Sequence, residues 1–365
     1  MDEKNYWLGF SVFNGIGPKR FKLLYDYFGS AKKIWQAKRE ALLATGLQIK
    51  IVNDLIRFRQ QFNPDFYSKW LLKKEIKFLT LADSNYPKNL KQIDDSPFLL
   101  YYKGEIKKSD DLAIGVVGTR RPTIYGKEVT ENLVADLTTC GLTIISGMAR
   151  GVDSIAHRTA MQYGGRTIAV FACGVDVIYP PENKKLSEEI IKNGAIVSEF
   201  PVGIKPSLGS FPYRNRIVSG LSLGVLVTEG AERSGSLITA RKAGEQGREV
   251  FAVPGPITSR MSAATSKLLK DGAKLVRNVG DILEELNVKV KRKKHLRGVA
   301  KRLLVGGLTK QEQLLLEVLK DGALHIDEIV RRTKMKTGQV CSLMTMMEIK
   351  GQVKNLGGMT YGLKR

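Results

Sequence analysis

The residues Leu112-Ala-Ile-Gly-Val-Val-Gly-Thr-Arg-Arg121 are the most informative for the fold, because a short apolar run ends there in a glycine turn with two arginines. The stretch Leu142-Thr-Ile-Ile-Ser-Gly-Met-Ala-Arg-Gly151 repeats this arrangement. Small residues let a ligand approach backbone N–H groups, and the start of a following helix favours negative charge. Guanidinium groups add forked donors that match phosphate oxygens. The two turns therefore predict a site for a phosphate-bearing molecule, with the candidate residues Gly118, Thr119, Arg120, Arg121, Ser146 and Gly147.

The region from 112 to 286 alternates throughout between strand-like and helix-like segments. The predicted strands are 112–117, 142–145, 167–171, 195–198, 224–228, 249–253 and 274–276, and the predicted helices between them include 125–140, 152–163 and 236–246. Near-continuous apolar strands separated by amphipathic helices indicate a parallel sheet that is covered on both faces. Ligands of such sheets bind outside the carboxyl ends of the strands, where the two turns are expected.

Both flanks of this region predict smaller helical domains. The segment Asn14-Gly-Ile-Gly-Pro-Lys-Arg20 resembles one half of a helix-hairpin-helix, for which DNA contact and a purely structural role remain equally open. The segment Tyr101-Tyr-Lys-Gly104 is expected to reach the central sheet as a strand. From Thr309, which forms a predicted capping box with Glu312, three helices and a hairpin suggest a winged helix. Its third helix offers few residues that read bases or phosphates, so protein docking or support of a dimer is at least as good an interpretation.

We expect an α/β chain of 365 residues, a length that allows two or three domains. An extended Rossmann-like parallel-sheet core is expected at 106–286. It follows an N-terminal helical domain of the helix-hairpin-helix or SAM-like type at 1–105. A basic linker is expected at 287–308, because residues 287–302 hold eight basic residues and no acidic one. The winged-helix-like domain is expected at 309–365.

The formal net charge of +23 predicts affinity for polyanions, but this charge is unevenly distributed. Lys and Arg minus Asp and Glu give +7 for residues 1–111, +4 for 112–286 and +12 for 287–365. A specific site in the central region must therefore depend on where its arginines lie. The sequence has no apolar run long enough for a membrane span and starts without a secretory signal pattern. Its three cysteines lack metal-ligand spacing, so we expect a reduced cytoplasmic protein.

Several familiar catalytic and cofactor motifs are missing. The first turn does not fit Gly-x-Gly-x-x-Gly, and the chain has no P-loop, so binding of NAD or of nucleotides at a P-loop is disfavoured. Asp153 and His157 stand four residues apart, but a first-turn carboxylate and a structural histidine explain them better than a metal or a catalytic pair. Cys173 lacks an activating histidine and is interpreted as a packed thiol. We therefore expect neither a cofactor nor a metal.

The hexapeptide Phe211-Pro-Tyr-Arg-Asn-Arg216 combines rings with two guanidinium groups in a stretch, 203–226, that has no acidic residue. Stacking of bases on aromatic rings tolerates any sequence, and arginine supplies backbone contacts. This pattern favours binding of a single strand through Phe211, Arg214, Asn215 and Arg216. Ser234 and Gly235 add a hydroxyl and a helix start to the predicted phosphate site. The acids Glu199, Glu229 and Glu232 near strand ends are expected to hold arginines in place.

Together these segments resemble the DNA-processing protein A family, also called DprA or Smf. The matching pieces are Val117-Gly-Thr-Arg-Arg-Pro-Thr-Ile-Tyr-Gly126, Ser146-Gly-Met-Ala-Arg-Gly-Val-Asp153 with Ala156-His157, Ala172-Cys-Gly174 with Tyr179-Pro180, Ser198-Glu-Phe-Pro201, Phe211-Pro-Tyr-Arg-Asn-Arg216, Ser234-Gly-Ser-Leu-Ile-Thr-Ala240 and Val253-Pro-Gly255. They occur in the family's order. The chain departs from the family pattern at two places. Lys205 is the nearest lysine before Phe211, and Ala264-Thr-Ser266 replaces the usual Gly-Thr-Asn.

The resemblance implies an extended Rossmann-like core that binds single-stranded DNA, usually as a homodimer. It also implies loading of the RecA recombinase onto incoming strands during natural transformation. By this likeness, DNA contact is carried onto Gly118, Thr119, Arg120, Ser146, Gly147, Phe211, Arg214 and Arg216. We therefore expect a non-enzymatic, sequence-tolerant single-strand binder that contacts RecA and no membrane. Two alternatives stay open, namely a Rossmann-like nucleotide-processing hydrolase and a structural adaptor whose basic flanks contact nucleic acid.

Overall fold

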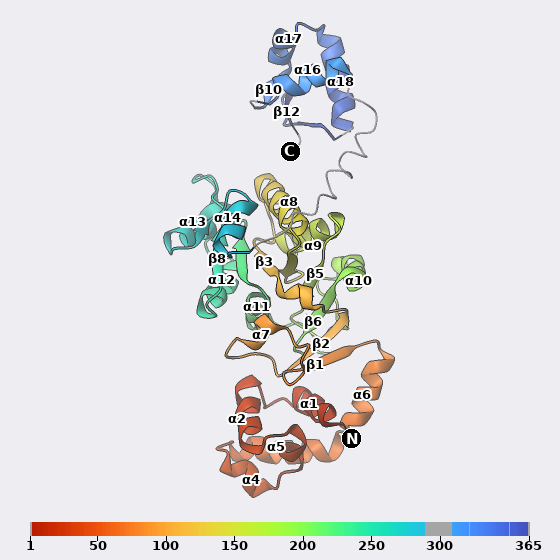
Figure 1. Cartoon of the computed structure of the whole chain (residues 1–365), viewed down its shortest axis with the longest axis vertical. Coiled ribbons are helices and arrows are strands. Elements are labelled where there is room, and N and C mark those ends of the chain that lie inside the picture. The colour runs from red at the N-terminus through yellow and green to blue at the C-terminus, as the bar shows by residue number, and fades with distance from the viewer. Residues whose placement is uncertain (1, 289–308, 321, 350, 364–365) are drawn as a thin grey trace. The chain divides into compact units, whose positions relative to one another are not determined.

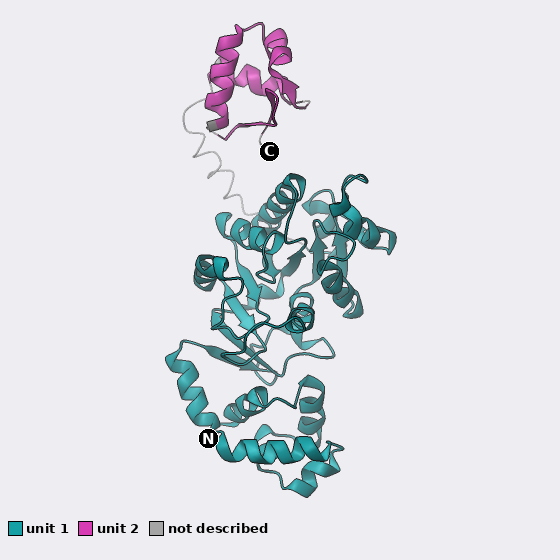
Figure 2. Ribbon diagram, turned by 180° about the vertical axis from the view of Figure 1, so that it is seen from behind, with its two compact units in different colours: residues 1–292 teal, residues 293–365 magenta. Residues whose placement is uncertain are grey.

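A computed structural model describes residues 2–288, 309–320, 322–349 and 351–363. The chain divides into two compact units, residues 1–292 and 293–365, which are coloured separately in Figure 2. Most of the predicted basic linker, 289–308, lies outside the described residues. No helix in the described parts of the chain combines the length and the apolar character needed to cross a membrane.

The first unit is built around one sheet, to which nine strands of the described chain contribute (Figure 1). In spatial order these are β1 (Lys77–Thr80), β2 (Leu99–Gly104), β6 (Ala195–Ser198), β5 (Thr167–Val170), β4 (Thr143–Ser146), β3 (Ala113–Val117), β7 (Gly224–Val227), β8 (Glu249–Ala252) and β9 (Lys274–Leu275). From β6 to β9 all neighbours pair in parallel, which confirms the predicted strands within about a residue. The sheet is mixed, because β2 pairs antiparallel with both β1 and β6.

Helices cover both faces of the sheet because its central strands are apolar on both sides. One face packs under α8 (Ile124–Thr139), α9 (Val152–Gln162) and α14 (Val279–Glu285), through residues such as Leu133, Val134, Ala156 and Ile282. The other face packs under α7 (Lys88–Lys91), α11 (Ser210–Gly220) and α12 (Ser236–Glu245). The first unit also contains α10 (Lys184–Asn193) and α13 (Ala263–Lys270). The predicted helices at 125–140, 152–163 and 236–246 are confirmed.

Six helices precede the sheet and share an aromatic core. They are α1 (Glu3–Val12), α2 (Pro18–Phe28), α3 (Ala31–Gln36), α4 (Arg39–Ala44), α5 (Ile49–Gln61) and α6 (Pro64–Lys73). Trp7, Phe10, Phe21 and Trp35 are buried together there, and α2 begins with Pro18 after its cap Gly17, within the segment that resembles a helix-hairpin-helix. β1 and β2 follow within residues 1–105, so part of the segment before 106 belongs to the sheet. Of these two strands, β2 is predicted from the sequence and β1 is not.

The second unit contains the predicted winged helix. Its helices are α16 (Lys310–Val318), α17 (Ile326–Thr333) and α18 (Thr337–Ile349), and its strands β10 (Leu324–His325), β11 (Val353–Asn355) and β12 (Thr360–Leu363) form one antiparallel sheet. The predicted capping box is present, since Glu312 N donates to Thr309 Oγ1 at 3.2 Å and Thr309 N donates to Glu312 Oε2 at 2.8 Å. β10 is an addition to the three helices and hairpin that the sequence predicts.

Candidate functional site

An open pocket of about 590 Å³ lies at the carboxyl ends of β3, β4 and β7. The chain runs outward from β3 through β4 and β5 to β6 and then returns to β7 on the other side of β3, so this is the switch point at which such sheets bind ligands (Figure 1). Nine of the predicted site residues line this switch-point pocket. They are Gly118, Thr119, Arg120, Gly147, Phe211, Arg214, Asn215, Ser234 and Gly235.

The turn after β3 is held tightly by its neighbours. Thr119 N donates to Glu229 O at 2.8 Å, and Val152 N donates to Thr119 O at 3.1 Å. A Cβ atom on Gly118 would lie 2.7 Å from Val152 Cγ2 and 2.8 Å from Glu229 O. Glycine is therefore required at 118 by contact with the protein's own backbone, and not by the approach of a ligand as the sequence analysis expected.

The turn after β4 already binds a carboxylate of the chain. Asp153 Oδ2 accepts hydrogen bonds from Gly147 N and Ala149 N, each at 3.1 Å. Burial raises the pKa of Asp153, while the charge of Arg214 opposes this rise. The prediction that Asp153 is a first-turn carboxylate is confirmed, and its position means that the Gly147 N–H is occupied by this side chain.

Arg214 forms the floor of the pocket and is 4 % exposed. Its guanidinium donates to Gly147 O at 2.7 Å and also to Val170 O. Burial lowers the pKa of Arg214 to about 10, so the group stays charged at neutral pH. A Cβ atom on Gly147 would lie 2.5 Å from this guanidinium, which explains the glycine at that position. Arg214 thus contributes positive charge to the pocket and links the ends of β4 and β5 through these two hydrogen bonds.

The mouth of the pocket carries an accessible cation over a ring. Arg120 is exposed, and its guanidinium carbon lies 5.6 Å from the centroid of the half-buried Phe211 ring. The Tyr179 ring is 5.6 Å from the same ring and 40 % exposed. Arg233, also exposed, lines the pocket beside Ser234 and Gly235, where α12 begins. This edge therefore offers two guanidinium groups, two rings and the positive end of a helix to an anionic ligand.

Tyr179 and Arg233 line the pocket but are not among the residues predicted from the sequence, although both lie beside the motifs quoted above. Tyr179 belongs to the Tyr-Pro pair and Arg233 directly precedes Ser234. Lys205, considered as the nearest lysine to Phe211, is exposed and does not line the pocket.

Three predicted residues lie outside the pocket lining. Arg121 is exposed and does not line the pocket, and Ser146 is buried, with its Oγ donating to Val116 O at 2.6 Å. Arg216 is 1 % exposed and forms an ion pair with Glu199, while its Nε lies 3.5 Å from Asp95 Oδ2. Its guanidinium carbon lies 4.4 Å from the Tyr213 ring centroid. Arg216 therefore anchors α11 inside the protein, where its burial keeps it from the surface of the pocket.

The acids near the strand ends differ in what they hold. Glu199 pairs with an arginine, as predicted. The same prediction is wrong for Glu229, which accepts from Thr123 N at 2.8 Å and from Thr123 Oγ1 at 2.6 Å at the start of α8. Because β3 and β7 are neighbours, the loop after β7 meets the first turn of α8, and the missing Cβ of Gly126 leaves room for this carboxylate.

The buried histidine and cysteine of the core have structural contacts. His157 Nδ1 lies 2.6 Å from Thr167 Oγ1, in agreement with the structural role predicted for it. Cys173 Sγ donates to Val177 O, and burial raises the pKa of this thiol to about 11, as expected of a packed thiol. Among the described residues, no group of three histidine, cysteine or carboxylate side chains is placed to hold a metal ion.

Burial lowers the pKa of His157 from 6.5 to about 3, so the folded protein holds a neutral ring while the unfolded chain takes up a proton. The unfolded state then binds more protons below pH 6.5, and stability falls as pH falls towards 3. Between pH 7 and pH 5 this single group is expected to remove about 2 kcal/mol from the free energy of unfolding. Urea unfolding at both pH values should show a smaller difference for His157→Gln, and an equal difference in both proteins would contradict the assignment.

The mixed sheet and the cationic pocket at its switch point define a Rossmann-like α/β protein with a site suited to phosphate-bearing ligands. The sequence matches the family model "DNA recombination-mediator protein A" over residues 77–287 and the "DprA winged helix domain" over residues 304–359. The chain belongs to the DNA recombination-mediator protein A family, as the resemblance of its motifs indicated.

Relatives and solved structures agree with this assignment. The chain is 34 % identical to protein Smf of Synechocystis sp. over 391 residues, with 98 % of each protein covered. The X-ray structure of DNA processing protein A from Streptococcus pneumoniae matches with a TM-score of 0.69 and 33 % identity, covering 78 % of this chain and 98 % of that one. DNA processing protein A of Helicobacter pylori, whose structure concerns its single-stranded DNA binding mode, matches with a TM-score of 0.53 and 36 % identity, covering 58 % and 96 %.

Proposed function

We propose that this protein is a recombination mediator that binds single-stranded DNA at the switch-point pocket without regard to sequence. One observation carries this proposal, namely the exposed Arg120 guanidinium that lies over the half-buried Phe211 ring at the mouth of the pocket. A ring offers a stacking surface to any base, and a guanidinium beside it binds the neighbouring phosphate. The single-stranded DNA binding described for the Helicobacter pylori relative supports the same ligand.

The contacts that we propose with the strand come from three loops. Arg120 and Arg233 bind phosphates, the Phe211 ring stacks with a base, and the start of α12 at Ser234 and Gly235 faces a further phosphate. Gly118, Thr119, Gly147 and Asn215 shape the wall, and Arg214 adds charge from the floor. Arg216 and Ser146 act from behind the wall, by holding α11 and β4 in place.

Binding through phosphates makes affinity depend on salt. If about four phosphates are neutralised, the logarithm of the association constant falls against the logarithm of salt concentration with a slope of roughly −3. Arg120→Ala is expected to weaken binding to every strand sequence and to make this slope about 0.7 less steep. Fluorescence anisotropy with labelled oligothymidine and with a mixed-sequence strand measures both quantities.

Arg121→Ala is the matched control, because it removes the same charge from the next residue, which does not line the pocket. It should cost clearly less affinity than Arg120→Ala. Equal losses would show that overall charge and not the pocket binds the strand, as the adaptor alternative holds. Release of free base from nucleoside monophosphates would instead favour the hydrolase alternative, and we propose that the protein is not an enzyme.

The wider role that we propose is action on RecA, as a homodimer in the cytoplasm. This part rests on membership of the recombination-mediator family and on the family resemblance of the motifs. Its test is the rate of RecA-catalysed ATP hydrolysis on a single strand, with and without the protein. An unchanged rate with a strand that the protein binds would contradict the RecA role while leaving strand binding intact.

A further inference from the structure

A second pocket, of about 360 Å³, lies in the first unit between α2, α7 and the segment that joins β1 to β2. Its floor is apolar, with the buried rings of Trp7, Phe21 and Phe98 packed against one another. The Phe21 and Phe98 rings are stacked with their centroids 4.2 Å apart. Ligand sites are commonly clefts of about 300 Å³ or more with an aromatic lining and a few polar groups, and this aromatic pocket fits that description.

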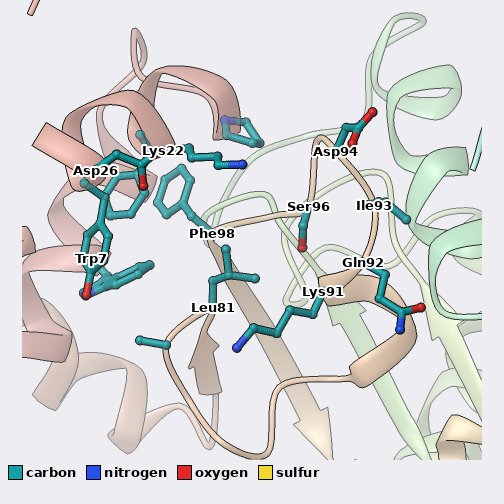
Figure 3. A pocket seen from close by; sticks show the side chains of 14 residues that line it. Trp7, Lys22, Asp26, Leu81, Lys91, Gln92, Ile93, Asp94, Ser96 and Phe98 are labelled. Carbon is teal, nitrogen blue, oxygen red and sulfur yellow. The ribbon is translucent and has the colours of Figure 1, made fainter. Parts of the chain in front are cut away.

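Two lysines line this pocket from different helices. Lys22 comes from α2 and Lys91 from α7, and Figure 3 shows the two side chains on either side of Ser96 and Phe98 in that view. Both lysines are exposed, and within the described parts of the chain neither ammonium makes an ion pair. Unpaired cations above an apolar floor favour a ligand that carries both an anion and a flat apolar body.

The other polar groups at the pocket suit hydrogen-bond donors on the ligand. Asp26 on α2 and Asp94 in the joining segment are carboxylates at its edge, and the Ser96 hydroxyl lies deeper. Carboxylates accept from ring N–H groups of bases and from sugar hydroxyls. A purely apolar peptide side chain would leave both ammonium groups without a partner, and a simple anion would leave the aromatic floor uncovered.

We infer that the aromatic pocket binds a nucleotide, with the base on the ring-lined floor and the phosphate between Lys22 and Lys91. The nucleotide comes either from free solution or from a unit of the bound single strand. The second source rests on the proposed function, because it makes the pocket a continuation of the strand site. The first source does not depend on that function.

Calorimetry with the full chain tests the free nucleotide. Arg120→Ala is built into the protein to weaken the switch-point pocket, and thymidine 5′-monophosphate, thymidine and inorganic phosphate are the probes. Thymidine 5′-monophosphate should bind most tightly, and Lys22→Ala with Lys91→Ala should weaken it about tenfold or more. Lys19→Ala with Lys88→Ala, on the same two helices but outside this pocket, should have no effect.

Fluorescence anisotropy with the protein that retains Arg120 tests whether the nucleotide in the aromatic pocket is a unit of the bound strand. An oligothymidine of about 6 nucleotides should bind equally well with and without Lys22 and Lys91, whereas one of about 30 nucleotides should bind less tightly to the double variant. An effect in either assay supports the nucleotide site and identifies its source. The inference is overturned if neither assay responds to the two lysines, or if inorganic phosphate binds as tightly as the nucleotide. The calorimetry uses a free nucleotide and needs no strand binding. It therefore tests the nucleotide site even if the protein does not bind single-stranded DNA.

Discussion

Replacement of Arg216 by methionine is expected to lower the free energy of unfolding by about 3–5 kcal/mol. Arg216 is 1 % exposed and pairs with Glu199, which burial makes hard to ionise, since it raises the pKa of that carboxyl to about 7. Methionine keeps much of the apolar stem but leaves the Glu199 carboxyl without its cation. Urea unfolding, monitored by far-ultraviolet circular dichroism of the full chain, measures the loss.

The double variant Arg216→Met with Glu199→Gln is the control, because it removes the buried charge together with its partner. It should recover much of the lost stability, because removing one partner leaves a buried charge unpaired, whereas replacing both partners does not. The strand-binding data add a second test. At temperatures where Arg216→Met is folded, the slope against salt should equal that of the parent protein. A stable variant with a shallower slope would mean that Arg216 binds phosphate.

Phe211→Ala should weaken single-strand binding by about 1–3 kcal/mol, or roughly 5- to 150-fold, for every base sequence tested. The half-buried Phe211 ring is the stacking surface beside Arg120, and its loss removes the base contact while leaving the guanidinium. Anisotropy with oligothymidine and oligodeoxyadenosine measures the change.

Phe211→Leu and Phe211→Trp distinguish stacking from packing. Leucine retains an apolar contact with Tyr179, whose ring centroid is 5.6 Å away, but it has no face for a base. It should therefore bind strands about as weakly as the alanine variant, whereas tryptophan should restore affinity. If leucine binds like phenylalanine, the ring packs against the protein without stacking with DNA.

The sheet could be predicted from sequence because its strands are short, apolar runs separated by helices. β3 to β7 are buried along their whole length, so each gives a mostly apolar run with at most Thr or Ser at its ends. β1, Lys-Phe-Leu-Thr at 77–80, gave none, because it is a short edge strand with a charged residue and lies among loop-like residues. The antiparallel extension of the sheet was therefore seen only in part.

The site was predicted in position but not in the roles of its arginines. α11 is buried on most sides, so its sequence does not alternate between a polar and an apolar face. The pattern therefore does not indicate that the side chains of Arg214 and Arg216 are buried. The partners of Arg216, Glu199 and Asp95, are far from it in sequence and meet it only after the chain has folded. The glycine turns were recognised, but the occupation of the Gly147 N–H by Asp153 depends on geometry that spacing does not give.

The pairing of β2 with β6 has a practical consequence for anyone who wishes to shorten this protein. A fragment that starts at residue 106 lacks β2, so Ala195–Ser198 becomes an exposed edge strand with unpaired backbone N–H and C=O groups. Exposed edges of this kind recruit strands from other molecules and promote aggregation. A truncation that begins before Lys77 keeps both antiparallel strands and the shield that they provide, which coincides with the start of the family match at residue 77.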